Sequence, residues 1–211
     1  MARHAPFPFG VAEGSLVVSR QIFERPPKLG TLYRRALFRR RPDRGLVAIP
    51  RIEAELTRVV PTEAALATYR RVTQDPSTER TLPICYPHVI ASPLHAALLA
   101  MPEFPYKILG LVHVENVITQ HRPIAEGEPL RVVCVIEGAE EAKKGISFDV
   151  QTEVTVDGER VWESASKILR IRKGGSGKSK AKRPPHVPGE APGAQRSVIW
   201  RLPGDLGRQY A

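Results

Sequence analysis

The sequence predicts an α+β protein in which an antiparallel sheet wraps around a central apolar helix. The segment 92–101 is apolar on all sides apart from His95, and a helix without a polar face must be enclosed. Long segments of alternating apolar and polar residues follow it, and these are typical of antiparallel strands with one dry face. The 211 residues are 42% apolar and 26% charged, which are ordinary values for a folded protein.

The first part of the chain is expected to supply two helices and one strand. Residues 1–28 are rich in proline and are predicted to be irregular. Residues 29–41 place apolar side chains on one face and arginines on the other, which predicts a basic amphipathic helix. Residues 51–60 alternate as a half-buried strand does. Pro61 and Thr62 then open the next helix, because proline suits the first helical positions and threonine is a good N-cap.

The enclosed helix has the strongest start signal in the chain. Ser92-Pro93 combines an N-cap residue with a proline at the first helical position. The helix is therefore predicted to begin there, after a loop over 75–87. Pro102 is expected to end it.

Three or four long strands are predicted to cover this helix. Along the third strand the alternation places Ser147, Asp149, Gln151, Glu153 and Thr155 outward and the apolar residues inward, as on a strand with one wet face. Asp157-Gly158 is a two-residue hairpin signal between the last two strands. The predicted strands are residues 109–121, 129–137, 145–156 and 159–172.

The remaining residues predict a linker and a second domain. Residues 29–172 form the first domain in this interpretation, and the Gly, Ser, Lys and Pro of 173–195 form a basic linker. Residues 196–211 read as a strand, a proline and a helix start, which echoes the pattern of the first domain. They are predicted to be the truncated start of a second, similar domain.

The net charge of +10 is concentrated outside the predicted sheet. Residues 34–44 and 173–183 each carry a net charge of +5, and the rest of the chain sums to zero. No nucleic-acid partner is expected, since such proteins carry their positive charge on the folded surface. The tract from Arg34 to Arg41 could make weak contact with an anionic membrane, but a helix packed on its own domain with a solvated basic face is favoured.

Other sequence features favour the cytoplasm. The N-terminus lacks the pattern of a secretory signal, and the sequence has no membrane-spanning apolar run. Cys85 and Cys134 are the only cysteines, too few for a disulfide framework or for a structural zinc site of their own. A reducing compartment is therefore expected, and no metal or cofactor is predicted.

Residues 82–124, LPICYPHVIASPLHAALLAMPEFPYKILGLVHVENVITQHRPI, resemble the central segment of MaoC-like acyl dehydratases and enoyl-CoA hydratases. These are hot dog proteins, and the likeness is to the N-terminal half of the double-hot-dog form. The terminal RLPGDLGRQYA resembles the start of the second half. The resemblance implies a hot dog fold, an acyl thioester on coenzyme A or acyl carrier protein, and a role in fatty acid metabolism.

The resemblance also implies which residues the chemistry needs. The family uses an Asp and a His five residues apart to add or remove water, and a backbone N–H at the start of the enclosed helix to polarise the thioester carbonyl. Asp75 falls at the aspartate position, but Arg80 stands where the histidine belongs. Ser92-Pro93 replaces the His-Gly of an active half, and Pro93 has no N–H to donate.

Further candidate residues are weighed against structural roles. His88, predicted in the loop, Ser92 and His95 could contact a thioester, or the two histidines could be hydrogen-bonded interior residues. His113 and Glu115 are placed on one strand face, but two ligands do not make a metal site. Tyr86 and Trp162 are expected to pack, and GGSGKSK at 174–180 is rejected as a phosphate loop.

The preferred hypothesis is a non-catalytic N-terminal hot dog half that shapes the acyl tunnel of a dehydratase or hydratase. Its partner would be a second hot dog domain or a second copy in a dimer. One alternative is a stand-alone hot dog subunit that pairs with an active chain. Another is a thioesterase, although such enzymes usually place a carboxylate or Gln near the enclosed helix, and 92–101 has none.

Overall fold

The computed structural model describes residues 16–38, 45–77 and 79–172, together with Gly204. The predicted linker 173–195 and the predicted second-domain start at 196–211 therefore lie outside the described residues, apart from Gly204. The elements are β1 (Ser19–Phe23), α1 (Leu29–Phe38), β2 (Ile52–Val59), α2 (Glu63–Thr73), α3 (Tyr86–Ala100), β3 (Leu111–Gln120), β4 (Leu130–Ile136), β5 (Glu140–Ala142), β6 (Gly145–Val156) and β7 (Glu159–Ile171).

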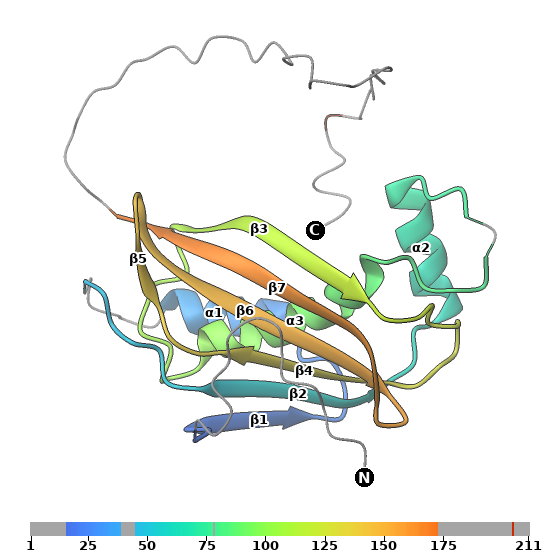
Figure 1. Cartoon of the computed structure of the whole chain (residues 1–211), viewed down its shortest axis with the longest axis horizontal. Helices are drawn as coiled ribbons and strands as arrows, with labels where there is room; N and C mark the ends of the chain where they lie inside the picture. The colour runs from blue at the N-terminus through green and yellow to red at the C-terminus, as the bar shows by residue number, and fades with distance from the viewer. Residues whose placement is uncertain (1–15, 39–44, 78, 173–203, 205–211) are drawn as a thin grey trace.

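The strands form one seven-stranded sheet that confirms the predicted fold class. Its order is β1-β2-β4-β6-β7-β3, and the short β5 pairs with β6 away from this path. All pairs are antiparallel except β1 with β2. Figure 1 shows α1 and α3 on one face of the sheet and α2 at one of its ends. The result is the hot dog arrangement, with β1 and β3 at the two edges.

The β6–β7 hairpin forms as predicted, because its turn is encoded locally. Asp157 and Gly158 have φ angles of 48° and 84°, as the favoured two-residue hairpin turn requires. Of the five side chains predicted to point outward from β6, Asp149 and Glu153 are partly exposed, whereas Ser147, Gln151 and Thr155 are only 4%, 7% and 5% exposed. The expected wet face of β6 is therefore only partly wet, and β6 lies inside the sheet between β4 and β7.

The central helix is enclosed, but it begins earlier than predicted. No residue of α3 is exposed, and the helix packs against α1, β2, β4 and β6. It starts at Tyr86 with Cys85 as N-cap, and Pro93 lies in its interior. Burial of Tyr86 and Pro87 extends the helix back through the Ser-Pro signal, so the predicted start, with Ser92 as N-cap, was seven residues too late. The predicted loop over 75–87 ends at Cys85, two residues earlier than predicted.

The helix before it is capped as the sequence predicts. Thr62 is the N-cap of α2, and its Oγ1 accepts a hydrogen bond of 3.2 Å from the backbone N–H of Ala65. Pro61 lies just before this cap. Gln74 ends the helix in the left-handed region at φ 54°. The chain then turns towards α3.

The N-terminal region differs from its prediction. Residues 1–28 were predicted to be irregular, but Ser19–Phe23 forms β1 and pairs in parallel with β2. So short a strand depends on its partner, which is why no local pattern revealed it. Helix α1 packs against α3, which favours the packed alternative for the basic helix, while membrane contact through Arg34 to Arg41 stays a prediction. Within the described ranges, no helix has the length and apolar character needed to cross a membrane.

Candidate functional site

Asp75 lies in a groove at one end of the molecule. It follows α2 directly, and the groove is enclosed by the end of α2, the segment that leads into α3, and the end of β3. The groove has a volume of about 520 Å³. Its polar lining includes Tyr69, Thr73, Asp75, Thr81, Cys85 and Gln120.

The carboxylate of Asp75 is engaged by its own segment. Its Oδ1 accepts a hydrogen bond of 3.0 Å from the backbone N–H of Ser77, and its Oδ2 lies 3.9 Å from Nε of Arg70. Arg80, at the position where the family has a histidine, is 90% exposed and lies 3.8 Å from Glu126. Asp75 is thus held as part of a turn, and Arg80 offers no proton-transfer partner, because a guanidinium does not deprotonate in proteins.

Arg70 fixes the shape of this segment. Its guanidinium donates hydrogen bonds of 2.9 Å to the carbonyl oxygens of Glu79 and Thr81, and one of 2.7 Å to Glu126. A planar guanidinium with several fixed donors suits such convergent acceptors. Arg70 therefore ties the loop that carries Asp75 to the neighbouring turn.

A second group of polar side chains lies on the inner face of the sheet, next to α3. We call it the polar strip. His95 Nε2 is 2.8 Å from Oγ1 of Thr152. The ring of His88 lies 5.2 Å from that of His95 and stacks at 6.0 Å on that of His113. Ser164 is the β7 residue directly opposite Thr152. The polar strip consists of His88, His95, His113, Thr152 and Ser164.

His88 was predicted in the loop before the helix, but it lies in the first turn of α3. This correction brings it onto the same helix as His95. Sequence reasoning weighed the histidines one at a time and missed Thr152 and Ser164. The alternation of the third and fourth predicted strands could have revealed them, because it places Thr152 and Ser164 on the apolar side of those strands, the side that α3 covers.

Burial favours the neutral form of two histidines in the polar strip, His88 and His95. Burial, with a smaller contribution from His113, lowers the pKa of His88. Burial, with smaller contributions from His88 and His113, lowers the pKa of His95 to about 3. Burial likewise raises the pKa of Cys134, whose Sγ lies 3.5 Å from Thr152, to about 12. The neutral imidazole that burial favours at His88 and His95 can both donate and accept hydrogen bonds.

Ser92 and Pro93 do not form a helix terminus. Ser92 Oγ donates a hydrogen bond of 3.0 Å to the carbonyl oxygen of His88 within α3. The prediction that Ser92-Pro93 starts the helix was wrong, because the helix starts at Tyr86. Its correspondence to the His-Gly of an active half stays a prediction. Pro87 occupies the first turn and removes one of the backbone donors that a helix N-terminus normally offers.

His113 and Glu115 were placed on one strand face, and this was also wrong. The register of β3 shifts between them, so His113 pairs with Ile168 and Glu115 with Lys167. Because Ile168 and Lys167 are consecutive on β7, the two side chains point to opposite faces. Among the described residues no group of three or more metal-binding side chains is arranged to hold an ion.

Tyr86 and Trp162 have the packing roles that were predicted. Trp162 is fully buried, and its Nε1–H donates a hydrogen bond of 2.8 Å to the carbonyl oxygen of Ile84. Tyr86 is 5% exposed and makes an edge contact of 5.0 Å with the ring of Tyr69.

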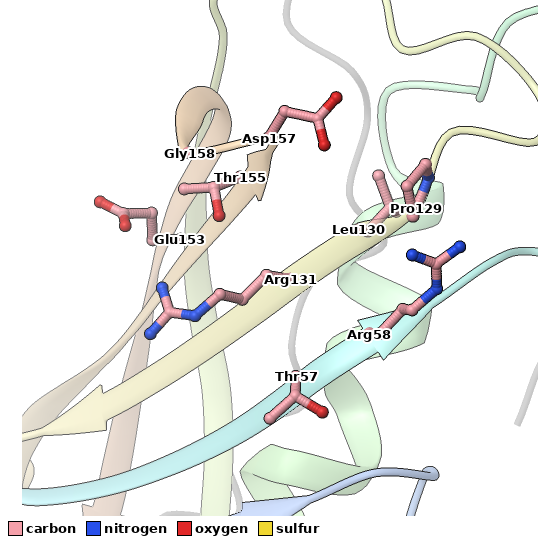
Figure 2. Close-up of a pocket in the computed structure, with 9 residues that line it drawn as sticks. All are labelled: Thr57, Arg58, Pro129, Leu130, Arg131, Glu153, Thr155, Asp157 and Gly158. Carbon is pink, nitrogen blue, oxygen red and sulfur yellow. The ribbon is translucent and has the colours of Figure 1, made fainter.

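A further groove, of about 300 Å³, lies at the end of β2, β4 and the β6–β7 hairpin. Figure 2 shows the guanidinium of Arg131 on the side of Glu153, and that of Arg58 on the opposite side. Arg131 is paired with Glu55 at 2.6 Å, and Glu153 with Arg160 at 2.8 Å. Two of the four charged side chains that line this groove are therefore already paired within the protein.

The fold and these sites define the class of protein. The chain is similar in sequence and fold to a hot dog acyl-thioester dehydratase. No protein-family model matches it. It is 29% identical over 133 residues to 3-hydroxyacyl-thioester dehydratase X of Mycobacterium tuberculosis (strain ATCC 25618 / H37Rv), an alignment that spans 62% of this chain and 45% of the relative.

Two crystal structures of HtdX from Mycobacterium tuberculosis show the same fold. One is 26% identical, with a TM-score of 0.57 and coverage of 74% of this chain and 60% of HtdX. The other is 28% identical, with a TM-score of 0.53 and coverage of 56% and 51%. The chain therefore spans about half the length of the relatives that it matches.

Proposed function

We propose that this chain is the non-catalytic hot dog half of a 3-hydroxyacyl-thioester dehydratase or hydratase, and that it forms a wall of the acyl-binding tunnel. The relative named above acts, by its name, on 3-hydroxyacyl thioesters. The substrate class proposed here is accordingly an acyl thioester of coenzyme A or of acyl carrier protein. The proposed location is the cytoplasm.

The main support for this proposal is that Asp75 has no histidine partner. Water addition to an enoyl thioester needs a base and an acid within reach of one water molecule. Asp75 is held by Ser77 and Arg70, and Arg80 occupies the position of the missing histidine. The groups that transfer protons then have to come from another domain or chain. The proposed task of this chain is to bind the acyl group and to support the catalytic domain.

The edge strand β3 supports the proposed pairing with a second hot dog unit. β3 lies at one end of the strand order, so one of its backbone edges has no neighbour among the described strands. Its valines are unusually open: Val112, Val114 and Val117 are 40%, 50% and 40% exposed. An exposed, apolar edge strand favours pairing with another strand. The proposed occupant is a second hot dog domain or a second copy of this chain.

The isolated chain is expected not to hydrate crotonyl-CoA above the uncatalysed rate. The physical reason is that Asp75 has no acid partner in its groove. Hydration is followed by the loss of enoyl-thioester absorbance, with an intact hot dog hydratase as positive control. Turnover that disappears in Asp75→Asn would contradict the proposal. Release of free thiol from an acyl-CoA would instead revive the thioesterase alternative, although α3 carries no carboxylate or Gln to activate water.

Val114→Lys is expected to convert a self-associated form of the chain into a monomer. A lysine on an exposed edge strand opposes strand pairing. The matched control is Ile22→Lys on the opposite edge, in β1, where the isoleucine is 60% exposed. Mass is measured by sedimentation across a concentration series. Equal loss of association in both variants would exclude β3 as the pairing edge.

A further inference from the structure

An exposed patch of apolar and basic side chains lies at the end of the sheet where β3 begins. Leu109 is 77% exposed in the turn that leads into β3, and Ile171 is 51% exposed at the end of β7. Lys143 and Lys144, both exposed, form the turn between β5 and β6. We call these four residues, together with the exposed Lys107, the tip patch. It lies at the left end of the sheet in Figure 1, where β5, the start of β3 and the end of β7 meet.

Backbone hydrogen bonds hold the three segments of the tip patch together. The backbone N–H of Ile171 donates to the carbonyl oxygen of Gly110 at 3.3 Å, and that of Arg172 donates to the carbonyl oxygen of Lys144 at 3.1 Å. Ile171 is also the β7 residue directly opposite Gly145, where β6 begins. The two turns and the strand end are thus tied to the same sheet, so the apolar and basic side chains are presented together.

The tip patch is positively charged. Its three lysines lie next to β5, whose acids have basic counterparts of their own: Glu140 is 3.6 Å from Lys167, and Glu141 is 2.5 Å from Arg172. In sequence, β7 is followed by residues 173–183, which carry a net charge of +5. Charge complementarity therefore favours an anionic partner at this end of the molecule.

The apolar members of the tip patch narrow the choice of anionic partner. A lipid surface buries apolar side chains at the boundary between headgroups and acyl chains, while lysines attract its acidic headgroups. The phosphates of a nucleic acid would engage the lysines but would leave Leu109 and Ile171 without an apolar partner. A second copy of this chain would bring a patch of the same charge. Of these partners, an anionic membrane matches both kinds of side chain.

The tip patch is remote from the groove that holds Asp75. β3 begins beside the patch at Leu111 and ends at Gln120, which lines that groove. Ten residues of extended strand span about 30 Å. An acidic carrier protein that delivered a thioester to the groove would dock beside the groove, and not at the far end of β3. A membrane at the tip patch, by contrast, leaves the groove open.

We propose that the tip patch binds the surface of an anionic membrane. Leu109 and Ile171 enter the headgroup region, and the lysines face the acidic headgroups. The contact is peripheral and reversible, because two apolar side chains and a few charges bind less strongly than a lipid anchor together with a polybasic segment. It uses the ends of the strands and not the free side of β3, and it does not rest on the proposed function.

The test is the partition of the 211-residue chain onto vesicles of phosphatidylcholine with about 30% phosphatidylglycerol, with pure phosphatidylcholine as the reference. Flotation measures the bound fraction, which is expected to be larger on the anionic vesicles. The double variant Lys143→Gln/Lys144→Gln should lower the partition coefficient about 25-fold, at about fivefold for each lysine. Leu109→Ala should lower it about fivefold, since a smaller apolar side chain enters the headgroup region.

Matched controls separate the patch from net charge and from apolar exposure in general. Arg58→Gln/Arg71→Gln removes the same charge from two exposed arginines at the end of β2 and on α2. Ile22→Ala shortens an isoleucine that is 60% exposed on β1. Each control should change the partition coefficient by less than about twofold, because charges beyond a Debye length of about 8 Å are largely screened.

A fluorescence measurement reports which side chain meets the lipid. Tryptophan placed in the patch by Leu109→Trp should be quenched by lipids with brominated acyl chains, and tryptophan placed on β1 by Ile22→Trp should not. The unsubstituted chain, with Trp162 and Trp200, gives the background for both.

Several results would overturn the proposal. One is an equal loss of vesicle binding in the lysine and arginine double variants, and another is a Leu109→Trp signal that brominated lipids leave unchanged. A loss confined to Lys178→Gln/Lys180→Gln would assign the contact to residues 173–183 instead. Binding of duplex DNA or acyl carrier protein in place of vesicles, lost in Lys143→Gln/Lys144→Gln, would make the tip patch an interface for an acidic macromolecule.

Discussion

Lowering the pH from 7 to 5 is expected to reduce the free energy of unfolding by about 2 kcal/mol through His95 alone. In the folded protein its pKa is lowered from 6.5 to about 3, so it stays neutral over this range. In the unfolded chain it takes up a proton below pH 6.5. The unfolded state then binds more protons than the folded state, and stability falls as the pH falls. His88, with a pKa lowered for the same reason, adds to the effect.

The window from pH 7 to 5 isolates the histidines from the carboxylates. Desolvation alone would raise the pKa of Glu55, but hydrogen bonds from Arg131 and Arg20 outweigh it and lower that pKa below 4.5. Its contribution to stability is therefore present above pH 4.5 and is lost only as the pH falls through its lowered pKa. Losses above pH 5 belong to the neutral histidines.

Urea unfolding at pH 7, 6 and 5 measures this effect. His95→Gln should flatten the dependence by removing the titrating group while keeping a partner for Thr152. Leu109→Ala, at a leucine that does not titrate and is 77% exposed, should leave the dependence unchanged. A free energy of unfolding that is constant from pH 7 to 5 would contradict a neutral, enclosed His95.

Features encoded by adjacent residues could be predicted from the sequence. The Asp157-Gly158 turn and the Thr62 cap depend on backbone angles and on hydrogen bonds within a few residues. The apolar composition of 92–101 also predicted that this helix is buried, although it did not show which elements bury it. These predictions needed no knowledge of distant contacts, and the structure agrees with them.

Features that depend on distant contacts could not be predicted. The core, rather than the Ser-Pro signal, decides where α3 starts, because Tyr86 packs against Tyr69 and is buried. The bulge that separates His113 from Glu115 leaves no local mark in the sequence. Asp75 was found through resemblance to a family, whereas the polar strip appears only when α3 and three strands are in register.

Trp162→Ala is expected to lower the free energy of unfolding by about 3–5 kcal/mol, the range for truncating a buried aromatic side chain. Trp162 is 0% exposed and lies on β7, under the start of α3. Its removal leaves a cavity between the sheet and the central helix. It also deprives the carbonyl oxygen of Ile84 of its hydrogen-bond donor.

The site makes this substitution informative about function as well as stability. Ile84 directly precedes the N-cap of α3 and lines the groove that holds Asp75, so the indole ties the groove to the sheet. Trp162→Phe keeps most of the packing and loses the hydrogen-bond donor, and it should lower the free energy of unfolding by about 1–3 kcal/mol.

Leu109→Ala, at a leucine that is 77% exposed, is the control and should change the free energy of unfolding by less than about 0.5 kcal/mol. Equal effects of Trp162→Ala and Leu109→Ala in urea unfolding would show that the sheet does not enclose α3, and the tunnel wall proposed for this chain would lose its physical basis.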